Sequence, residues 1–293
     1  MFVATLIAVG SLRHEHIDAA RNAIAATGAV PGETMWLDEG SAADIFFTGD
    51  LLVVRSAIAV LDLPIDFAVQ PVASRAKRLL VADMDSTMIT IECIDELADY
   101  AGIKPQIAEV TERAMRGELD FASALTERVA LLKGLDDGMI DICRAERVKL
   151  MPGAKTLVKT LRSRGAHAVL VSGGFTRFAE PVGEELGFNR AIANVLGIAD
   201  GKLTGTVEFP IVDAERKRTE LVAHAGALGI AIENTLAIGD GANDIPMIEA
   251  AGLGIAYHAK EKARAAADAS ISRGDLTTVL YMLGITRADW IEG

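Results

Sequence analysis

The pattern of apolar and polar positions over residues 1–70 predicts four strands and two helices. Apolar runs rich in β-branched and aromatic residues indicate strands, and they cover 2–9, 33–38, 43–47 and 65–69. Apolar residues recur at helical spacing over 14–26 and 51–61, and Asp50 stands where it could cap the second helix. The resulting order, βαββαβ, predicts a ferredoxin-like domain.

Beyond residue 78 the pattern changes to short apolar runs separated by amphipathic helical stretches. This alternation is typical of a parallel sheet covered by helices. The predicted strands are Leu79–Ala82, Ala168–Val171, Thr235–Ile238 and Leu253–Ala256. The first two strands are separated by far more residues than the dozen or so that a crossover needs. We therefore expect an inserted helical module over about 91–149.

A short polar connector, Pro71 to Lys77, lies between these two patterns. Domain boundaries fall in such segments, so we expect one domain over 1–72 and a second over 73–293. The predicted fold class is α/β. It consists of a Rossmann-like parallel sheet with an inserted helical cap, preceded by a small ferredoxin-like domain.

The charge balance is acidic, with 29 Lys and Arg against 41 Asp and Glu and a net charge of −12. Such a chain repels nucleic acid and anionic membranes, so we expect neither as a partner. The most apolar stretch, Leu51 to Leu61, is too short to span a bilayer. No basic leader precedes the N-terminal apolar run, and Cys93 and Cys143 show no metal-ligand or disulfide-scaffold spacing. These features favour a cytoplasmic location.

Two acidic segments each follow a predicted strand. The first is Asp83-Met84-Asp85-Ser86-Thr87 and the second is Gly239-Asp240-Gly241-Ala242-Asn243-Asp244. Parallel strands deliver such residues to the carboxyl edge of the sheet, where ligands bind. Four carboxylates at one edge repel one another unless a divalent cation lies between them, and hard oxygen ligands favour Mg²⁺ over zinc.

Each acidic segment has a simpler interpretation. Asp83 or Asp85 could cap the next helix, since Asp is a preferred N-cap residue. The second segment could be a dinucleotide-binding loop, but it lacks the third glycine and its acids would repel a pyrophosphate.

Two further segments offer groups that bind anions. Ser172-Gly173-Gly174 follows a predicted strand, and a hydroxyl with free N–H groups at a helix start can bind an anion. An ordinary turn is the alternative. Lys217 lies in the charged run 213–218, which could equally be a solvated helix face. A serine nucleophile with a histidine base is not supported, because no G-x-S-x-G segment is present.

In this order, the four segments resemble the four motifs of the haloacid dehalogenase superfamily. Within the helical insert, Glu92, Met115, Phe121 and Arg128 resemble the cap of its phosphoserine phosphatase subfamily, and the resemblance extends over residues 78–283. The N-terminal segment resembles the ACT-like domain only in its order of elements.

The resemblance implies a Mg²⁺-dependent phosphomonoesterase acting on O-phosphoserine, with Asp83 as nucleophile and Asp85 as acid and base. Mg²⁺ is expected at Asp83, Asp85 and Asp240, with the main-chain carbonyl of Met84 as a further ligand. Ser172, the N–H of Gly173 and Lys217 would bind the phosphoryl oxygens, and Asp244 would orient Lys217 or a metal-bound water. These assignments follow from the resemblance alone.

The resemblance also implies how the amino-acid part of the substrate is bound. Arg128 would bind the substrate carboxylate and Glu92 its ammonium group, while Met115, Phe121 and Asn243 would contact the substrate. Three alternatives stay open: a phosphotransferase, a phosphatase of broader specificity, and an amino-acid-binding regulatory protein with a vestigial catalytic fold. A membrane ion pump is disfavoured because the chain lacks spanning helices, and a homodimer through the N-terminal domain is possible.

Overall fold

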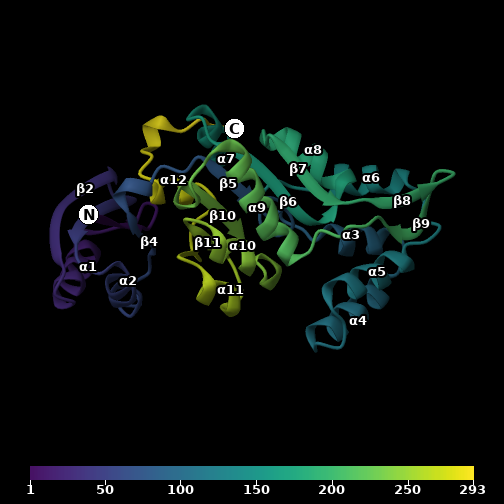
Figure 1. Ribbon diagram of the computed structural model, residues 1–293, viewed down its shortest axis with the longest axis horizontal. Helices are drawn as coiled ribbons and strands as arrows, with labels where there is room; N and C mark the ends of the chain where they lie inside the picture. The colour runs from purple at the N-terminus through teal and green to yellow at the C-terminus, as the bar shows by residue number, and fades with distance from the viewer.

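A ten-stranded sheet runs through the chain in the order β2-β3-β1-β4-β12-β11-β10-β5-β6-β7. The computed structural model describes residues 1–293, apart from the side chain of Met115. The N-terminal elements lie at one end of the molecule and a helical cap lies at the other, with the parallel part of the sheet between them (Figure 1).

The N-terminal elements have the predicted order βαββαβ. They are β1 (Phe2–Ile7), α1 (His14–Ala26), β2 (Val30–Asp38), β3 (Ala42–Thr48), α2 (Leu51–Ala59) and β4 (Asp66–Pro71). Asp50 caps α2 as expected, since its carboxylate accepts from the N–H groups of Leu52 and Val53 at 2.9 and 3.1 Å. Strand β1 pairs antiparallel with both β3 and β4, which gives the ferredoxin-like strand order.

The parallel part of the sheet contains the four predicted strands and two that the sequence pattern did not indicate. Its strands are β5 (Leu79–Ala82), β6 (His167–Phe175), β10 (Thr235–Gly239) and β11 (Gly254–Tyr257), with β7 (Arg190–Asn194) and β12 (Ala269–Ile271) at its two sides. Because β5 is buried on both faces, it is a continuous apolar run rather than an alternating one.

Helices cover both faces of this sheet. Leu80 and Ala82 face a core formed with α7 (Ala154–Ser163), α8 (Thr176–Leu186) and α12 (Thr278–Met282). Leu79 and Val81 face a second core formed with α9 (Ala214–Leu228) and α10 (Ile245–Ala250). Helix α11 (Glu261–Ala266) and the short 3₁₀ segments Val72–Ser74, Ile232–Asn234, Ala242–Asp244 and Arg287–Asp289 complete the chain.

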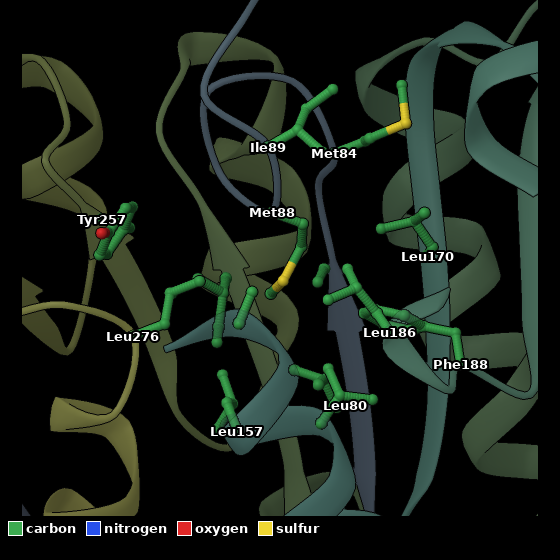
Figure 2. Close-up of a cluster of buried hydrophobic side chains, with 14 of the residues drawn as sticks. Leu80, Met84, Met88, Ile89, Leu157, Leu170, Leu186, Phe188, Tyr257 and Leu276 are labelled. Atoms are coloured by element: carbon green, nitrogen blue, oxygen red, sulfur yellow. The ribbon is translucent and has the colours of Figure 1, made fainter. Parts of the chain in front are cut away.

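Figure 2 shows part of the larger core directly below the acidic loop that follows β5. Met88 points down from this loop among Leu80, Leu157 and Leu276. The loop is therefore held in place by apolar packing.

The helical cap lies between β5 and β6, where the insertion was expected. It contains α3 (Cys93–Tyr100), α4 (Lys104–Met115), α5 (Phe121–Leu131) and α6 (Gly138–Arg147). Where the chain enters and leaves the cap, Thr90 N–H donates to the Lys149 carbonyl and Met151 N–H donates to the Met88 carbonyl, at 3.0 and 2.9 Å.

A β-hairpin that the sequence analysis missed is attached to the cap. It consists of β8 (Leu196–Ala199) and β9 (Lys202–Val207). The Gly134 N–H donates to the Leu203 carbonyl and the Leu203 N–H donates to the Leu135 carbonyl, both at 2.8 Å. The cap is therefore built from two separate parts of the chain (Figure 1).

The N-terminal elements and the parallel sheet are joined by pairing and by buried polar contacts. Strand β12 pairs antiparallel with β4 through Ser270 and Phe67. Arg75, just after β4, forms an ion pair with the fully buried Asp44 at 2.6 Å. No helix in the described part of the chain is long and apolar enough to cross a membrane.

Candidate active site

The two acidic segments meet at the carboxyl edge of the parallel sheet. Strands β5 and β10 are hydrogen-bonded neighbours, with Ala82 opposite Ile238, and the Asp83 N–H donates to the Ile238 carbonyl at 3.0 Å. Asp83 and Asp240 therefore leave adjacent strands at the same edge. Side-chain oxygens of Asp83, Asp240 and Asp244 all lie within 4.8 Å of one another.

Lys217 joins two of these acids. Its ammonium nitrogen lies 2.6 Å from Asp83 Oδ1 and 2.7 Å from Asp244 Oδ1, and all three side chains are buried. Burial lowers the pKa of Lys217, but the charges of Asp244 and Asp83 outweigh it and raise that pKa above its ordinary value. Lys217 is therefore a buried cation at the sheet edge, and the solvated-face alternative for this residue is wrong.

Asp244 is held from both sides. Its Oδ2 accepts from the main-chain N–H groups of Asp240 and Gly241, at 3.1 and 3.0 Å. Its Oδ1 accepts from Lys217. This close packing requires a glycine at position 239, since a Cβ there would lie 2.3 Å from Asp244 Cγ.

Burial also governs the protonation of Asp83. It raises the pKa of Asp83 well above its usual value, the neighbouring Asp244 adds to the shift, and Lys217 opposes it. The same cause, followed by the charge of Asp244, raises the pKa of Asp240 to about 6. Without a cation between them, these acids are poorly solvated and repel one another.

The carboxylate of Asp85 lies against the first residue of cap helix α3. Its Oδ2 accepts from the Cys93 N–H at 3.3 Å, whereas its Oδ1 is buried and finds no hydrogen-bond partner among the described residues. Burial, followed by the charge of Glu92, raises the pKa of Asp85 to about 7. A carboxyl group with this pKa can both donate and accept a proton near neutral pH.

The Ser172-Gly173-Gly174 segment forms a bulge at the end of β6. Val171 pairs with Ile192 and Phe175 pairs with Asn194, so three residues of β6 lie opposite the single residue Ala193. Ser172 is buried, and its Oγ accepts from the Gly174 N–H at 2.8 Å. Its own O–H is then available to donate to a ligand.

Two of the expected cap residues, Glu92 and Arg128, lie near Asp85. Glu92 Oε1 accepts from the Ser86 hydroxyl at 2.8 Å. Arg128 is half-buried on α5 and forms no ion pair within the described part of the structure. Burial lowers the pKa of Arg128, and Asp95, Glu92 and Asp85 oppose this shift.

The remaining expected residues are placed as follows. The Phe121 ring lies against the bulge, because a Cβ on Gly173 would be 3.0 Å from its Cζ. Asn243 is half-buried in the 3₁₀ turn that carries Asp244. The side chain of Met115 lies outside the described residues.

The donor set fits a hard divalent cation. It offers several carboxylate oxygens and no sulfur or imidazole, and the unpaired Asp85 Oδ1 lies nearby. The Met84 carbonyl is a poor candidate ligand, because it accepts from the N–H groups of Thr87, Met88 and Ile89 at 3.2, 2.8 and 3.0 Å. The adjacent Asp85 carbonyl accepts no hydrogen bond within the described structure, so it is the better main-chain candidate.

Two polar residues at this edge were given no role in the sequence analysis. The Thr87 hydroxyl lies 3.4 Å from Asp240 Oδ1. The buried Asn194 side chain bonds the bulge of β6 and the segment that precedes α9. Thr87 stands in the first acidic segment and could have been predicted. Asn194 ends a strand that the pattern did not reveal.

Comparisons with known proteins agree with this geometry. A haloacid dehalogenase-like hydrolase family model matches residues 80–249. The chain is 50% identical to a phosphoserine phosphatase of Mycobacterium tuberculosis over 82% of its length, and 51% identical to one of Streptomyces coelicolor over 73%. It spans only 59% and 52% of the lengths of these two relatives.

Two solved structures match almost the whole chain. A HAD family hydrolase from Salmonella enterica serovar Typhi has a TM-score of 0.83 at 28% identity, covering 97% of this chain and 99% of its own. A probable phosphoserine phosphatase from Vibrio cholerae has a TM-score of 0.77 at 35% identity, covering 98% of this chain and 87% of its own. The chain belongs to the haloacid dehalogenase-like hydrolase family.

Proposed function

We propose that this protein hydrolyses O-phospho-L-serine to L-serine and phosphate through an aspartyl-phosphate on Asp83. The main support is the position of Arg128, a half-buried cation that is near Glu92 and Asp85 but forms no ion pair in the described structure. A cation held in this way is suited to a substrate carboxylate, which its planar fork can bind at two points. The names of relatives such as the mycobacterial phosphoserine phosphatase agree with this substrate.

In the first step an Asp83 oxygen attacks phosphorus and the bond from phosphorus to the seryl oxygen breaks. Protonated Asp85 gives its proton to the departing seryl oxygen. In the second step water attacks phosphorus, Asp85 takes a proton from that water, and the bond to Asp83 breaks. The raised pKa of Asp85, about 7, suits a group that alternates between acid and base.

We assign Asp83, Asp240 and a main-chain carbonyl as ligands of Mg²⁺, with Asp85 beside them. When bound, Mg²⁺ offsets the negative charge that the phosphate and these acids bring together. Ser172, the Gly173 N–H and Lys217 donate to the phosphoryl oxygens, and Asp244 orients Lys217. Glu92 receives the substrate ammonium group, and Phe121 and Asn243 complete the substrate contacts.

A phosphate-release assay with Mg²⁺ tests the function. We expect phosphoserine to be preferred over a panel of phosphomonoesters that lack a carboxylate or an amine. Asp83→Asn should abolish turnover while leaving the fold intact, because the amide keeps the shape but is a poor nucleophile. Equal rates across the panel would overturn the substrate assignment, and normal turnover by Asp83→Asn would overturn the mechanism.

We also propose a domain boundary between residues 72 and 73. Residues 1–72 contain none of the catalytic groups, and α1 and α2 pack on a hydrophobic core of their own. A chain of residues 73–293 should keep measurable phosphatase activity. Its stability should be reduced, because removal of the N-terminal elements exposes α12 and leaves the edge of β12 without a partner strand. An inactive fragment that is nonetheless folded would contradict this division. A cytoplasmic location and a homodimer through the N-terminal domain stay predictions.

A further inference from the structure

Asn194 connects two segments that carry phosphate-binding groups. It ends β7, is 1% exposed, and uses both ends of its side-chain amide. Its Nδ2 donates to the Gly173 carbonyl and its Oδ1 accepts from the Val212 N–H, both at 2.8 Å. The amide can adopt only this orientation, because the Gly173 carbonyl only accepts and the Val212 N–H only donates.

The bond to Gly173 fixes the orientation of the Ser172 hydroxyl. The bulge removes Gly173 from the ladder between β6 and β7, so its carbonyl needs another donor. Asn194 supplies that donor. The peptide whose carbonyl it holds has the Gly174 N–H on its other side, and this N–H donates to Ser172 Oγ at 2.8 Å. Ser172 is thereby fixed as an acceptor toward the protein and as a donor toward the ligand.

The bond to Val212 reaches the second segment. Val212 precedes Asp213, which caps α9 by accepting from the Arg216 N–H at 2.8 Å. The next residue of that helix is Lys217, whose ammonium lies 2.6 Å from Asp83. The chain leaves the parallel sheet after Asn194 to form the β8–β9 hairpin of the cap, and it returns at Val212. One side chain therefore bonds both the segment that carries Ser172 and the segment that leads to Lys217, at the base of the hairpin.

We propose that Asn194 is a positioning residue, which holds the Ser172 hydroxyl and the Lys217 helix in register for binding the phosphoryl group. The proposal rests on the proposed phosphatase function, but it does not depend on which ester is the substrate. It predicts that damage to Asn194 weakens the phosphoryl site while the cap's contacts to the rest of the substrate remain intact.

Two variants separate this role from simple packing. Asn194→Asp keeps the acceptor for Val212 and replaces the donor to the Gly173 carbonyl by a second acceptor. Asn194→Ser removes both bonds without burying a charge. The matched control is Asn189→Asp, because Asn189 Oδ1 accepts from the Ala168 N–H at 2.9 Å at the opposite end of β6.

The full-length enzyme with Mg²⁺ is assayed on phosphoserine and on p-nitrophenyl phosphate, with orthovanadate as an inhibitor that occupies the phosphoryl site. For both Asn194 variants we expect kcat to fall about ten- to a hundredfold on both esters, the cost of losing a buried polar contact. The vanadate inhibition constant should rise by a similar factor, and KM for phosphoserine should change by less than about threefold. Asn189→Asp should leave all three quantities near those of the wild type.

Folded Asn194 variants with unchanged kcat and vanadate inhibition would overturn the proposal. So would an equal loss in Asn189→Asp, or failure of both Asn194 variants to fold, since Asn194 would then serve only stability. If the wild type cleaves p-nitrophenyl phosphate but not phosphoserine, only the substrate assignment fails. The p-nitrophenyl phosphate and vanadate measurements still decide the role of Asn194.

Discussion

Lys217 and Asp244 form a fully buried ion pair, with 2.7 Å between the ammonium nitrogen and Oδ1. Asp244 also accepts two main-chain N–H groups, so its carboxylate is fixed by the loop that carries Asp240. Lys217 in turn lies 2.6 Å from Asp83. The position of the proposed nucleophile thus depends on a residue two contacts away.

Asp244→Asn should lower kcat by about ten- to a hundredfold, because one buried charge-assisted hydrogen bond to Lys217 is lost. The amide can still accept the two main-chain N–H groups, but its NH₂ then faces the ammonium of Lys217. Steady-state kinetics and a thermal melt measure the effect. Asp289→Asn is the control, since Asp289 is exposed and its ion pair with Arg164 is long, at 3.9 Å. An unchanged kcat would show that Lys217 does not need Asp244.

Arg75→Ala should destabilise the protein by about 3–5 kcal/mol, because it leaves Asp44 buried without its charge partner. Asp44 is 0% exposed and meets two nitrogens of Arg75, at 2.6 and 2.7 Å. Arg75 also donates to the Met282 carbonyl at 3.0 Å, so it ties the N-terminal sheet to α12. Urea unfolding measures the change.

Two further variants test this interpretation of Arg75. Arg116→Ala removes exposed pairs with Glu112 and Glu118 and should change stability little, because solvent screens such pairs. Adding Asp44→Asn to Arg75→Ala should recover part of the lost stability, since the buried charge is gone. No recovery in the double variant would show that packing, not charge, accounts for the loss.

The pH dependence of stability should reveal Lys77. Burial lowers the pKa of Lys77 to about 8, while Asp268 and Glu233 oppose the shift. In the unfolded chain a lysine titrates near 10.4, so between about pH 8 and pH 10.4 the unfolded state binds more protons than the folded state. The contribution of Lys77 to stability therefore rises with pH through this window and is least favourable below pH 8.

Comparison with Lys77→Met isolates this contribution from that of the other lysines. The free energy of unfolding of the wild type, minus that of the variant, should increase from pH 7.5 to pH 10, by at most about 3 kcal/mol. Urea titrations of both proteins at each pH provide the difference. Parallel curves would mean that Lys77 titrates normally in the folded protein.

Local signals explain which elements the sequence could predict. The run Leu79–Ala82 is a strand buried on both faces, and the cap of α2 by Asp50 is a contact between neighbours in sequence. The β8–β9 hairpin did carry such a signal, because Asp200-Gly201 separates two apolar runs and both residues have positive φ.

Other features depend on contacts that no local pattern contains. Strand β12 has three residues and is recognisable only from its pairing with β11 and β4. Asn194 gains its importance from a bulge in a neighbouring strand. The Met84 carbonyl was expected to bind the metal, but the turn after β5 directs three N–H groups to it. Only the folded backbone reveals these relationships.

Arg128→Ala tests the recognition of the amino-acid part of the substrate. Arg128 lies on cap helix α5, and its only hydrogen bond within the described structure is from Nε to the Ala124 carbonyl at 3.3 Å. The remaining guanidinium donors are free to bind a carboxylate. Loss of this part-buried, charge-assisted contact should lower kcat/KM on phosphoserine about ten- to a hundredfold.

The same variant should change little on p-nitrophenyl phosphate, which carries no carboxylate and relies on the groups at the sheet edge. Arg128→Lys should recover only part of the loss, because an ammonium keeps the charge but not the planar fork. Arg113→Ala, which removes a part-buried cap pair with Glu127, is the matched control and should leave both substrates unaffected. An equal decline on both esters would assign Arg128 to folding or closure of the cap. No decline on either ester would remove the main support for phosphoserine, and the substrate would then have to be sought among phosphomonoesters without a carboxylate.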